Sequence, residues 1–513
     1  MKKTSRLYLP KRLPMHSTFD KLFRRYPIKS RRALEIGPPL LSLFLISMPV
    51  WGALFFPVPL SYFIIFFDIY WLYKSVNLVV TSYIAARKIR SAERKNWNEI
   101  ASKKENYSKV THLIVVPSYK ESIEKIRDTI DSIKDQSFPT KRIFVYLALE
   151  KREEGAEQKA IELQKEYAPY LGGFHYTLHP DLPDEVKGKS SNQAFAAKVA
   201  YQDLVKAKKV DVEFMTVTSA DADVIFDKQY YAFLANSFLT VPDPIYTFWQ
   251  SANVNYNNFW KVPSFTRVIS FFGSLWRTSV LVQHARLVPN SVYSLSFKLL
   301  MEIGNWDTDV IPEDYRIFFK AFYKTKGRVA VEPIFLKTSM DAAQSYTYVR
   351  SLLNKYHQER RWSWGVADDA TYIKWYLTVK GIPFFKKTVL LTNVLMDHIL
   401  WPVNWFIITI SANLVALLNP VFTRSNLGYT LPNISAFILT MCLVSLIAMI
   451  YVDYTLGPKK NQENHSKIRK FLFPLEFIFM PVGGFFLSAL PALISHVQLI
   501  IGKRLEYKVT EKV

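Results

Sequence analysis

Long apolar runs lie at both ends of this chain and enclose a middle segment in which apolar and polar residues are mixed. The runs cover residues 37–56, 58–83, 388–420, 429–454 and 471–502. A helix that crosses a bilayer needs roughly 20 apolar residues, and each of these runs is long enough. The middle segment, residues 86–386, has no run of that length. The pattern therefore predicts membrane helices on both sides of one folded domain.

This pattern divides the chain into five parts. They are a basic cytosolic arm (1–36), two transmembrane helices (37–85), a cytosolic α/β domain (86–386), C-terminal transmembrane or interfacial helices (387–502) and a basic tail (503–513). Prolines and glycines in the last apolar run allow either one long tilted helix or a tight hairpin. The hairpin keeps the basic tail in the cytosol, so we expect six spans, with five as the alternative.

Within the middle segment, short buried strands alternate with segments of helical periodicity. We predict strands at 112–117, 142–149, 174–178 and 214–218, and helices at 121–136, 155–167 and 191–206. Such alternation is typical of a mostly parallel sheet with helices on its faces. Ligands of such sheets bind at the carboxyl ends of the strands. Pro117, Glu150 and Asp221 all fall at ends of this kind.

The charge of the chain supports the membrane assignment. The 513 residues carry a net charge of +23, and 50% of them are hydrophobic. The cations lie beside the apolar runs, where anionic lipids attract them, so we expect no nucleic-acid partner. Cytosolic loops are enriched in Lys and Arg, which predicts a multi-pass protein of the plasma membrane with residues 86–386 in the cytosol. The one cysteine, Cys442, can form no internal disulfide.

The first acidic motif, Asp221-Ala-Asp223, comes directly after the strand predicted at 214–218. Carboxylates at i and i+2 on such a loop can approach one Mg²⁺ or Mn²⁺ together, and the cation can neutralise a departing diphosphate. Most acidic pairs of this kind are solvated turns. The position after a buried strand favours a metal site here.

Glu313 and Asp314 form a second acidic motif with two possible roles. A sugar transfer with inversion needs a carboxylate that takes the proton of the attacking hydroxyl, and Asp314 is the candidate for this catalytic base. The same pair can cap the helix predicted at 315–323, because acidic side chains favour helix N-termini. The two roles are compatible, since a base at a helix start is held rigidly.

Gln358, Arg361 and Trp362 place an amide, a cation and an indole close together. The guanidinium can pair with a diphosphate, and the indole can stack on the apolar face of a sugar. The alternative is a basic amphipathic helix that lies on the membrane surface.

Further candidate substrate contacts lie at strand ends and on a loop. Pro117, Tyr119, Glu121 and Glu150 are expected near the base and ribose of a nucleotide. Lys189 lies between Gly188 and Ser190, and it is expected near a phosphate. A true phosphate-binding P-loop is excluded, because Pro183 occupies the position of its first glycine.

Taken together and in this order, the motifs resemble those of the processive family-2 glycosyltransferases, which include the cellulose, chitin and hyaluronan synthases. In that family an Asp-x-Asp pair holds the metal and the nucleotide-sugar, the Asp of a Thr-Glu-Asp motif is the general base, and Gln-x-x-Arg-Trp binds the acceptor end and the diphosphate. Matched by position, the three motifs correspond to Asp221 and Asp223, to Asp314, and to Gln358, Arg361 and Trp362. The resemblance covers residues 110–370 and implies a GT-A-like (Rossmann-like) domain that uses Mg²⁺ or Mn²⁺.

Some segments depart from the family pattern. The segment Pro117-Ser-Tyr-Lys-Glu121 resembles the opening Pro-x-Tyr-Asn-Glu, with Lys120 where Asn is usual. The second predicted strand ends in Glu150, where the family has an Asp-rich segment that contacts uracil, which leaves the nucleotide open. Tyr293-Ser-Leu-Ser296 takes the place of an acceptor-contacting Phe-x-Gly-Ser segment, and Phe272-Gly-Ser274 is the rival match.

The resemblance implies an inverting membrane glycosyltransferase that takes a sugar from a nucleotide-sugar, expected to be a UDP-sugar, and extends a polysaccharide that is exported through the membrane helices. A first alternative adds one sugar to a lipid acceptor, because Gln-x-x-Arg-Trp also occurs in lipid glucosyltransferases. A second alternative, of a different class, is a transporter or channel with a regulatory cytosolic domain, suggested by Asp397-His398 in an apolar run. The expected partners are a nucleotide-sugar donor, a glycan or lipid acceptor and the membrane.

Overall fold

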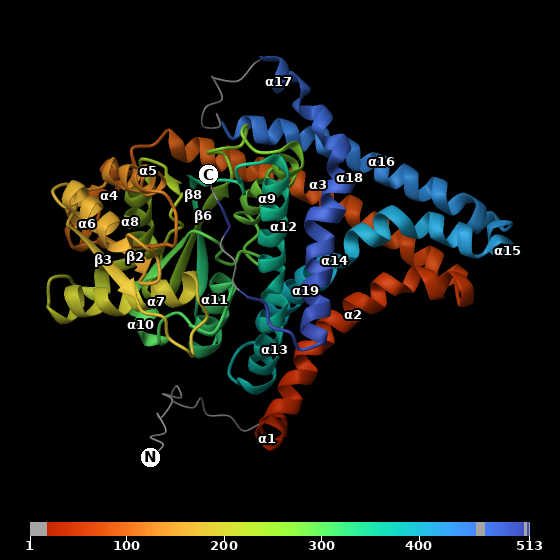
Figure 1. Ribbon diagram of the computed structural model, residues 1–513, viewed down its shortest axis with the longest axis horizontal. Coiled ribbons are helices and arrows are strands. Elements are labelled where there is room, and N and C mark those ends of the chain that lie inside the picture. The colour runs from red at the N-terminus through yellow and green to blue at the C-terminus, as the bar shows by residue number, and fades with distance from the viewer. Residues whose placement is uncertain (1–17, 458–466, 507–509, 512–513) are drawn as a thin grey trace.

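The computed structural model describes residues 18–457, 467–506 and 510–511 and has two parts (Figure 1). A sheet with helices on both faces forms one part, and long helices that point away from the sheet form the other. The first half of the predicted basic arm lies outside the described residues. The same holds for Lys459 and Lys460 of the basic loop that joins the apolar runs 429–454 and 471–502, and for Lys508 and Lys512 of the tail.

Within the described residues, one sheet of eight strands has the order β3-β2-β1-β4-β7-β6-β8-β5. The strands are β1 (Thr111–Ser118), β2 (Ile143–Glu150), β3 (Gly173–His179), β4 (Met215–Ser219), β5 (Ile225–Phe226), β6 (Thr247–Val254), β7 (Tyr293–Ser296) and β8 (Ala330–Ser339). Strands β3, β2, β1 and β4 run parallel, whereas β7 is antiparallel to both β4 and β6. The parallel half brings the carboxyl ends of β1, β2 and β4 to one edge, which is where such sheets bind ligands.

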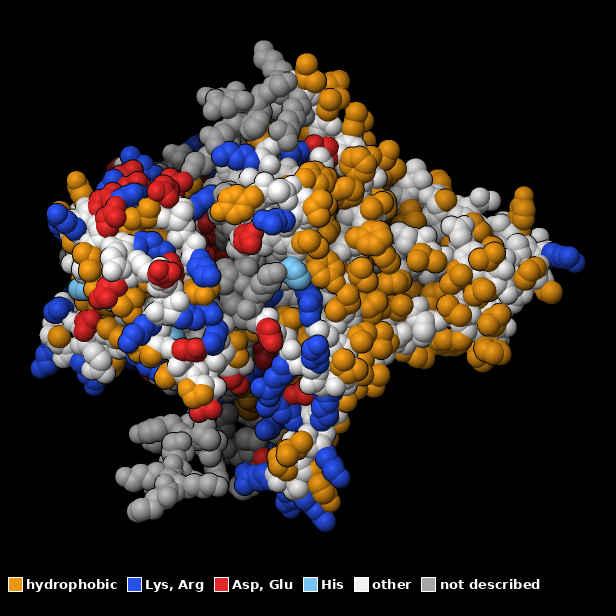
Figure 2. All heavy atoms as spheres, in the orientation of Figure 1, with side chains coloured by type: hydrophobic (Ala, Val, Ile, Leu, Met, Phe, Trp, Pro, Cys, Tyr) orange, Lys and Arg blue, Asp and Glu red, His pale blue; other side chains and the backbone are white. Residues whose placement is uncertain are grey.

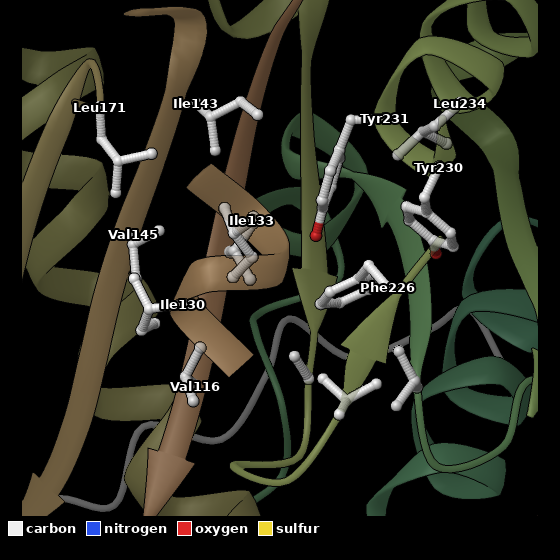
Figure 3. Packing of buried hydrophobic residues seen from close by; sticks show 14 of the residues in the cluster. Val116, Ile130, Ile133, Ile143, Val145, Leu171, Phe226, Tyr230, Tyr231 and Leu234 are labelled. Carbon is white, nitrogen blue, oxygen red and sulfur yellow. The ribbon is translucent and has the colours of Figure 1, made fainter. Parts of the chain in front are cut away.

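Helices cover both faces of the sheet. The α-helices of this part are α4 (Trp97–Ser102), α5 (Ile123–Lys134), α6 (Ala156–Tyr167), α7 (Lys189–Ala200), α8 (Tyr230–Thr240), α9 (Ser264–Val280), α10 (Phe297–Glu302), α11 (Glu313–Lys324), α12 (Tyr348–Ser363) and α13 (Asp369–Thr378). Apolar side chains of α5, α6 and α8 pack on one face, and those of α7, α10 and α11 pack on the other. Figure 3 shows residues of the first face, among them Ile130 and Ile133 of α5, Val116 of β1 and the tyrosines of α8.

The strands and helices predicted between residues 112 and 218 are present with nearly the expected bounds. The α/β class predicted for this part is confirmed, and the part is joined to long helices that are apolar enough to cross a membrane. The sheet is mixed, however, where a mostly parallel one was expected. The antiparallel pairings are those of β7 with β4 and β6 and of β5 with β8, whereas the other neighbouring strands pair in parallel.

Among the described residues, four long apolar helices project from the sheet part: α2 (Pro27–Phe55), α3 (Pro57–Glu93), α14 (Phe384–Leu418) and α16 (Asn426–Thr455). The short helix α1 (Thr18–Arg25) precedes them, so helix begins within the predicted basic arm. The far ends meet at a tip formed by the α2–α3 turn and α15 (Pro420–Thr423), where Asn419 donates to the Ala53 carbonyl (2.9 Å). Hydrophobic side chains cover this part (Figure 2), and each helix is long and apolar enough to cross a bilayer.

A fifth apolar stretch, Phe473–Ile500, lies across the base of the projecting helices instead of alongside them (Figure 1). After α17 (Lys467–Leu472) it combines a 3₁₀ segment (Phe473–Phe479), α18 (Met480–Gly484), a π segment (Phe485–Ala489) and α19 (Leu490–Ile500). Both of its ends contact the sheet part. Glu476 pairs with Arg267 of α9, and Gln498 accepts a hydrogen bond from Arg360 of α12 (2.7 Å).

The continuous helical path of this stretch shows that the predicted hairpin is wrong, and with it the count of six spans. Five long apolar helices occur in the part of the chain that the structure describes. The positive-inside rule favours the hairpin because it returns the basic tail to the side of the basic loop. In the structure both ends of this stretch contact the sheet part, so the basic loop and the basic tail can lie on the same side without a hairpin.

Gly484 allows this stretch to pack closely against α14. A Cβ atom at this position would overlap the ring of Trp405. We predict that Gly484→Ala destabilises the protein by about 1–3 kcal/mol, because the ring or the helix must move. The thermal unfolding midpoint in detergent measures this effect. Gly37→Ala is the control, since a Cβ there meets no atom within 4 Å, and equal midpoints for the two variants would contradict the close packing.

Candidate active site

A large cavity lies where the sheet part meets the projecting helices, and we call it the junction cavity. Its volume is about 1070 Å³, and its walls include the carboxyl ends of β1 and β2, the loop after β4, and the helices α3, α9, α12, α14 and α16. All residues predicted to bind substrate line it: Pro117, Tyr119, Glu121, Glu150, Lys189, Asp221, Gln358, Arg361 and Trp362. Glu313 and Asp314 line it as well, whereas Asp223 does not.

Lys189 joins the two acidic motifs. It begins α7, and its ammonium lies 2.8 Å from Oδ1 of Asp221 and 3.1 Å from Oε1 of Glu313. Burial alone would lower the pKa of Lys189, but the two carboxylates hold this pKa well above its ordinary value. The charged lysine therefore compensates one of the two negative charges. Its position beside them is compatible with the phosphate contact expected from the sequence.

Asp314 lies in the first turn of α11 and faces the junction cavity. Its Oδ2 accepts a hydrogen bond from the backbone N–H of Ser291 (2.9 Å), and its Oδ1 accepts one from that of Tyr315 (2.8 Å). Burial raises the pKa of Asp314, and these backbone donors act against the rise. Burial also raises the pKa of Glu313. A carboxylate with a raised pKa accepts a proton more readily, which is what a general base needs.

Ser291 is a residue of this site that the sequence did not reveal. Its N–H binds Asp314, its hydroxyl donates to Oδ2 of Asp221 (2.9 Å), and its carbonyl accepts a hydrogen bond from Lys189 (2.8 Å). It therefore connects the candidate base to the candidate metal ligand. Its φ of +54° is uncommon for a residue with a side chain. The pair Asn290-Ser291 before a strand is a turn signal, but it carries no information on function.

The two carboxylates of the Asp-x-Asp motif differ in position. Asp221 lines the junction cavity, whereas Asp223 is buried and accepts a hydrogen bond from the backbone N–H of Asp341 after β8 (2.8 Å). No group of three or more His, Cys, Asp or Glu side chains that could hold a metal occurs among the described residues. Mg²⁺ is often held by one or two carboxylates together with substrate phosphates. Asp221 is the carboxylate of this motif that reaches the cavity and would share a cation with a diphosphate in this way, and its oxygens are engaged here by Lys189 and Ser291.

The segment from Pro117 to Glu121 forms a compact loop at the end of β1. Oε2 of Glu121 accepts hydrogen bonds from the Ser118 hydroxyl (2.8 Å) and from the N–H of Tyr119 (2.6 Å). Lys120 has a φ of +69°, and its N–H binds Glu153 (2.9 Å). Asn adopts this left-handed conformation more readily than Lys does. The geometry therefore explains why Asn suits the position that Lys120 occupies.

We predict that Lys120→Asn stabilises the protein by up to about 1 kcal/mol, because it relieves backbone strain at a positive φ. The thermal unfolding midpoint in detergent measures the gain. Lys120→Val should have the opposite effect, because a β-branched residue tolerates a positive φ poorly. A midpoint for Lys120→Asn below that of the wild type would show that the strain is absent or offset elsewhere.

Glu150, at the end of β2, forms one corner of the junction cavity. Its carboxylate pairs with Arg152, whose guanidinium carbon lies 4.0 Å from the centroid of the Tyr119 ring. The corner expected to receive the base and ribose thus contains an aromatic ring stacked on a guanidinium. Such a stack offers planar contacts and hydrogen-bond donors to a nucleotide.

Helix α12 carries the Gln-x-x-Arg-Trp motif and packs against α19. Gln358 accepts a hydrogen bond from Lys355 (2.9 Å), and the Lys355 ammonium lies 4.7 Å from the centroid of the Trp362 ring. Arg361 donates to the hydroxyl of Thr510 in the C-terminal tail (3.0 Å). Because Thr510 also lines the junction cavity, the tail and the motif meet at the same wall. The helix is thus packed between other elements and is not a bare surface helix.

The membrane side of the junction cavity is lined by aromatic rings and amides. The side chains concerned include those of Trp71, Trp401, Asn404, Trp405 and Asn413. Indole rings can stack on the apolar faces of sugars, and amides can bind their hydroxyls. This wall is therefore suited to a carbohydrate chain.

Asp397 and His398 of α14 each bind a residue of the sheet part. The carboxylate of Asp397 pairs with Arg286, with N–O distances of 2.6 and 2.8 Å. Nδ1 of His398 lies 2.7 Å from Oδ1 of Asp369 at the start of α13. The pair that suggested a transporter thus joins a membrane helix to two elements of the sheet part.

The two segments weighed for the acceptor-contacting position lie in different places. Tyr293–Ser296, the preferred match, is the buried strand β7 in the middle of the sheet. Phe272 and Gly273 of the rival match line the junction cavity. The rival segment is therefore the one that can reach a ligand there.

No family model matches the chain, and no curated protein matches it either. Solved structures similar to it include mannosyltransferase PcManGT from Pyrobaculum calidifontis in complex with GDP-Man and Mn2+, which is 16% identical and aligns over 72% of this chain and 99% of its own, with a TM-score of 0.41. S. aureus TarS 1-349 in complex with UDP-GlcNAc is 13% identical over 66% of this chain and 90% of its own, with a TM-score of 0.36. At these levels of similarity, function has to be inferred from this chain's own residues.

Proposed function

We propose that the protein is an inverting glycosyltransferase that takes a sugar from a nucleotide-sugar, expected to be a UDP-sugar, with the help of Mg²⁺ or Mn²⁺. The observation that carries this proposal is the junction cavity, where Asp221, Asp314 and the Arg361-Trp362 pair face one space. Donor binding, removal of a proton and acceptor binding require groups of these kinds.

In the proposed reaction, the acceptor hydroxyl attacks the anomeric carbon of the donor sugar. Asp314 takes the hydroxyl proton as the new carbon–oxygen bond forms, and the bond from the anomeric carbon to the diphosphate oxygen breaks. Asp221 would hold a divalent cation, which would supply neutralising charge for the diphosphate. Lys189 and Arg361 add positive charge to the same cavity, and Trp362 offers a ring face to the acceptor sugar.

We propose further that the acceptor is a growing polysaccharide that leaves through the membrane helices. The junction cavity extends from Asp314 to residues of α14 and α16 such as Trp405 and Pro432. A chain extended at Asp314 can therefore enter the space between the projecting helices without leaving the cavity. The rings and amides on this wall supply contacts for its sugars.

The sheet part is proposed to face the cytosol of a plasma-membrane protein. Cations gather where the projecting helices meet the sheet part, and they include Arg31, Arg32, Arg87, Lys88, Arg90, Lys386 and Lys387. At the opposite tip, the segment around α15 carries Arg424. The positive-inside rule places the side rich in cations in the cytosol, where nucleotide-sugars are made.

Two alternatives to this proposal are addition of a single sugar to a lipid, and a transporter or channel that transfers no sugar. Single addition to a lipid uses the same catalytic groups and stops after one sugar. A transporter was suggested by Asp397 and His398, and these two side chains are engaged by Arg286 and Asp369. Product length separates polysaccharide extension from single addition, and turnover of a nucleotide-sugar separates both from transport.

The experiment uses the full-length protein in detergent or nanodiscs, supplied with radiolabelled UDP- and GDP-sugars and Mg²⁺ or Mn²⁺. Products are separated by size and treated with glycan-degrading enzymes of known specificity. A long, digestible polymer whose synthesis stops with EDTA is the expected result. One sugar on extracted lipid would replace polysaccharide extension with the lipid alternative, and no turnover of any donor would contradict the enzymatic proposal.

A further inference from the structure

The membrane side of the junction cavity contains a cation that the proposed reaction does not use. Lys74 lines the cavity from α3, about 25 Å along the helix from Pro57 at the tip. One turn further along α3, the side-chain amide of Asn77 donates to Gln283 of the sheet part (3.4 Å). Lys74 therefore lies at the level where the projecting helices meet the sheet part.

Lys74 forms no ion pair with a carboxylate of the described residues. Its ammonium lies 5.8 Å from the centroid of the Tyr70 ring, and its charge interacts with those of Arg286 and Asp397. Within the described residues, Asp397 is the one acidic side chain that α3, α14, α16 and α18 contribute to the cavity wall. Arg286 already pairs with both oxygens of Asp397. The three charges together leave one positive charge uncompensated.

The other carboxylates of the cavity wall belong to the sheet part and have partners there. Those paired with cations are Asp221 and Glu313 with Lys189, Glu150 with Arg152, Asp341 with Lys125, and Glu359 with Lys355. Asp314 accepts hydrogen bonds from the backbone N–H groups of Ser291 and Tyr315, and Glu121 accepts them from Ser118 and Tyr119. A partly buried cation at membrane level is costly to keep without a counter-ion, and such residues commonly mark binding sites. An anionic ligand beside Lys74 would supply the missing negative charge locally.

We propose that Lys74 and Arg286 form an anion-binding subsite for the acceptor, which carries a carboxylate or phosphate close to its growing end. This inference rests on the proposed function, because it assigns the chemistry of the acceptor in the same cavity. An acidic sugar of the extended chain and the phosphate of a lipid-linked acceptor both supply such an anion. A wholly neutral acceptor would leave the charge of Lys74 unpaired.

The test measures ligand binding to the full-length protein in nanodiscs of neutral lipid by titration calorimetry. Four probes are compared: a glucuronate-containing tetrasaccharide, neutral cellotetraose, a polyprenyl phosphate and the corresponding polyprenol. We expect one anionic probe to bind at least about tenfold more tightly than its neutral counterpart, as a charge-assisted contact would give. This preference should fall about tenfold in Lys74→Gln and should weaken with added salt.

Two variants serve as controls for charge and folding. Lys74→Arg keeps the cation and should keep most of the preference. Lys88→Gln removes a cation from the same helix outside the cavity, where Lys88 lies over the Phe335 ring, and should leave the preference unchanged. The tetrasaccharide arm and the lipid arm identify the source of the anion.

Three results would overturn the inference. They are equal binding of anionic and neutral probes, binding of none of the four, and a preference that survives in Lys74→Gln. Binding of nucleotide-sugars with Mn²⁺ is measured on the same preparations. Loss of the anion preference with intact donor binding contradicts this inference alone, whereas a wild-type protein that binds no donor contradicts the proposed function.

Discussion

Replacing Asp314 with asparagine is expected to lower sugar transfer by a factor of about 10²–10⁴ while nucleotide-sugar binding stays close to that of the wild type. The amide cannot take the proton of the acceptor hydroxyl, but it has nearly the same volume as the carboxylate. It can still accept a hydrogen bond from one of the two backbone donors, those of Ser291 and Tyr315. Initial rates of product formation and donor titrations on the same preparation measure the two effects separately.

Asp309→Asn is the matched control for this substitution. Asp309 lies five residues earlier in the chain, is exposed and does not line the junction cavity. Its replacement removes a carboxylate near the same helix and should leave transfer unchanged. Donor binding lost in Asp314→Asn, with an unchanged unfolding midpoint, would show that Asp314 holds the donor and is not the base.

The second large effect is expected at the Asp-x-Asp motif, where the two carboxylates should respond differently. Asp221→Asn should reduce the affinity for a nucleotide-sugar in Mn²⁺ to the level that the wild type shows in EDTA, a loss of about tenfold or more. Calorimetric titrations with and without the metal measure this. An Asp221→Asn variant whose donor affinity still depends on Mn²⁺ would exclude Asp221 as a ligand of the cation.

Asp223→Ala should weaken donor binding and also destabilise the fold. Its carboxylate accepts the backbone N–H of Asp341, and a buried donor left without an acceptor costs about 1–3 kcal/mol. The thermal unfolding midpoint should therefore fall in Asp223→Ala and remain near the wild-type value in Asp221→Asn. The reverse order would contradict the supporting role of Asp223.

Much of the sheet part could be predicted because its strands are buried runs with clear boundaries. The runs that became β1, β2 and β4 end in Ser118, Glu150 and Ser219, so the residues that follow them necessarily gather at one edge of a parallel sheet. This is why Tyr119, Glu150 and Asp221 reach the same cavity although 102 positions separate the first from the last.

Other features depend on geometry that no local pattern encodes. Ser291 acts through its main chain and a positive φ, and neither is visible in an Asn-Ser pair. The different positions of Asp221 and Asp223 depend on the segment after β8, which is distant in sequence. The apolar length of Phe473–Ile500 alone suggests a helix that crosses the membrane. Its actual direction depends on the contacts of its two ends with α9 and α12, which the sequence does not reveal.

The ion pairs formed by Asp397 and His398 limit which truncated forms of the protein can be studied. A protein truncated to residues 86–386 would retain Arg286 and Asp369 but would lose the partners that neutralise or orient them. It would also lose the cavity wall that α3, α14 and α16 provide, and water would take its place. The truncated protein would keep Trp362 but would lack Trp71, Trp401 and Trp405, whose rings line the proposed path of the acceptor. Enzymology on this protein therefore requires the intact chain in a lipid-like environment.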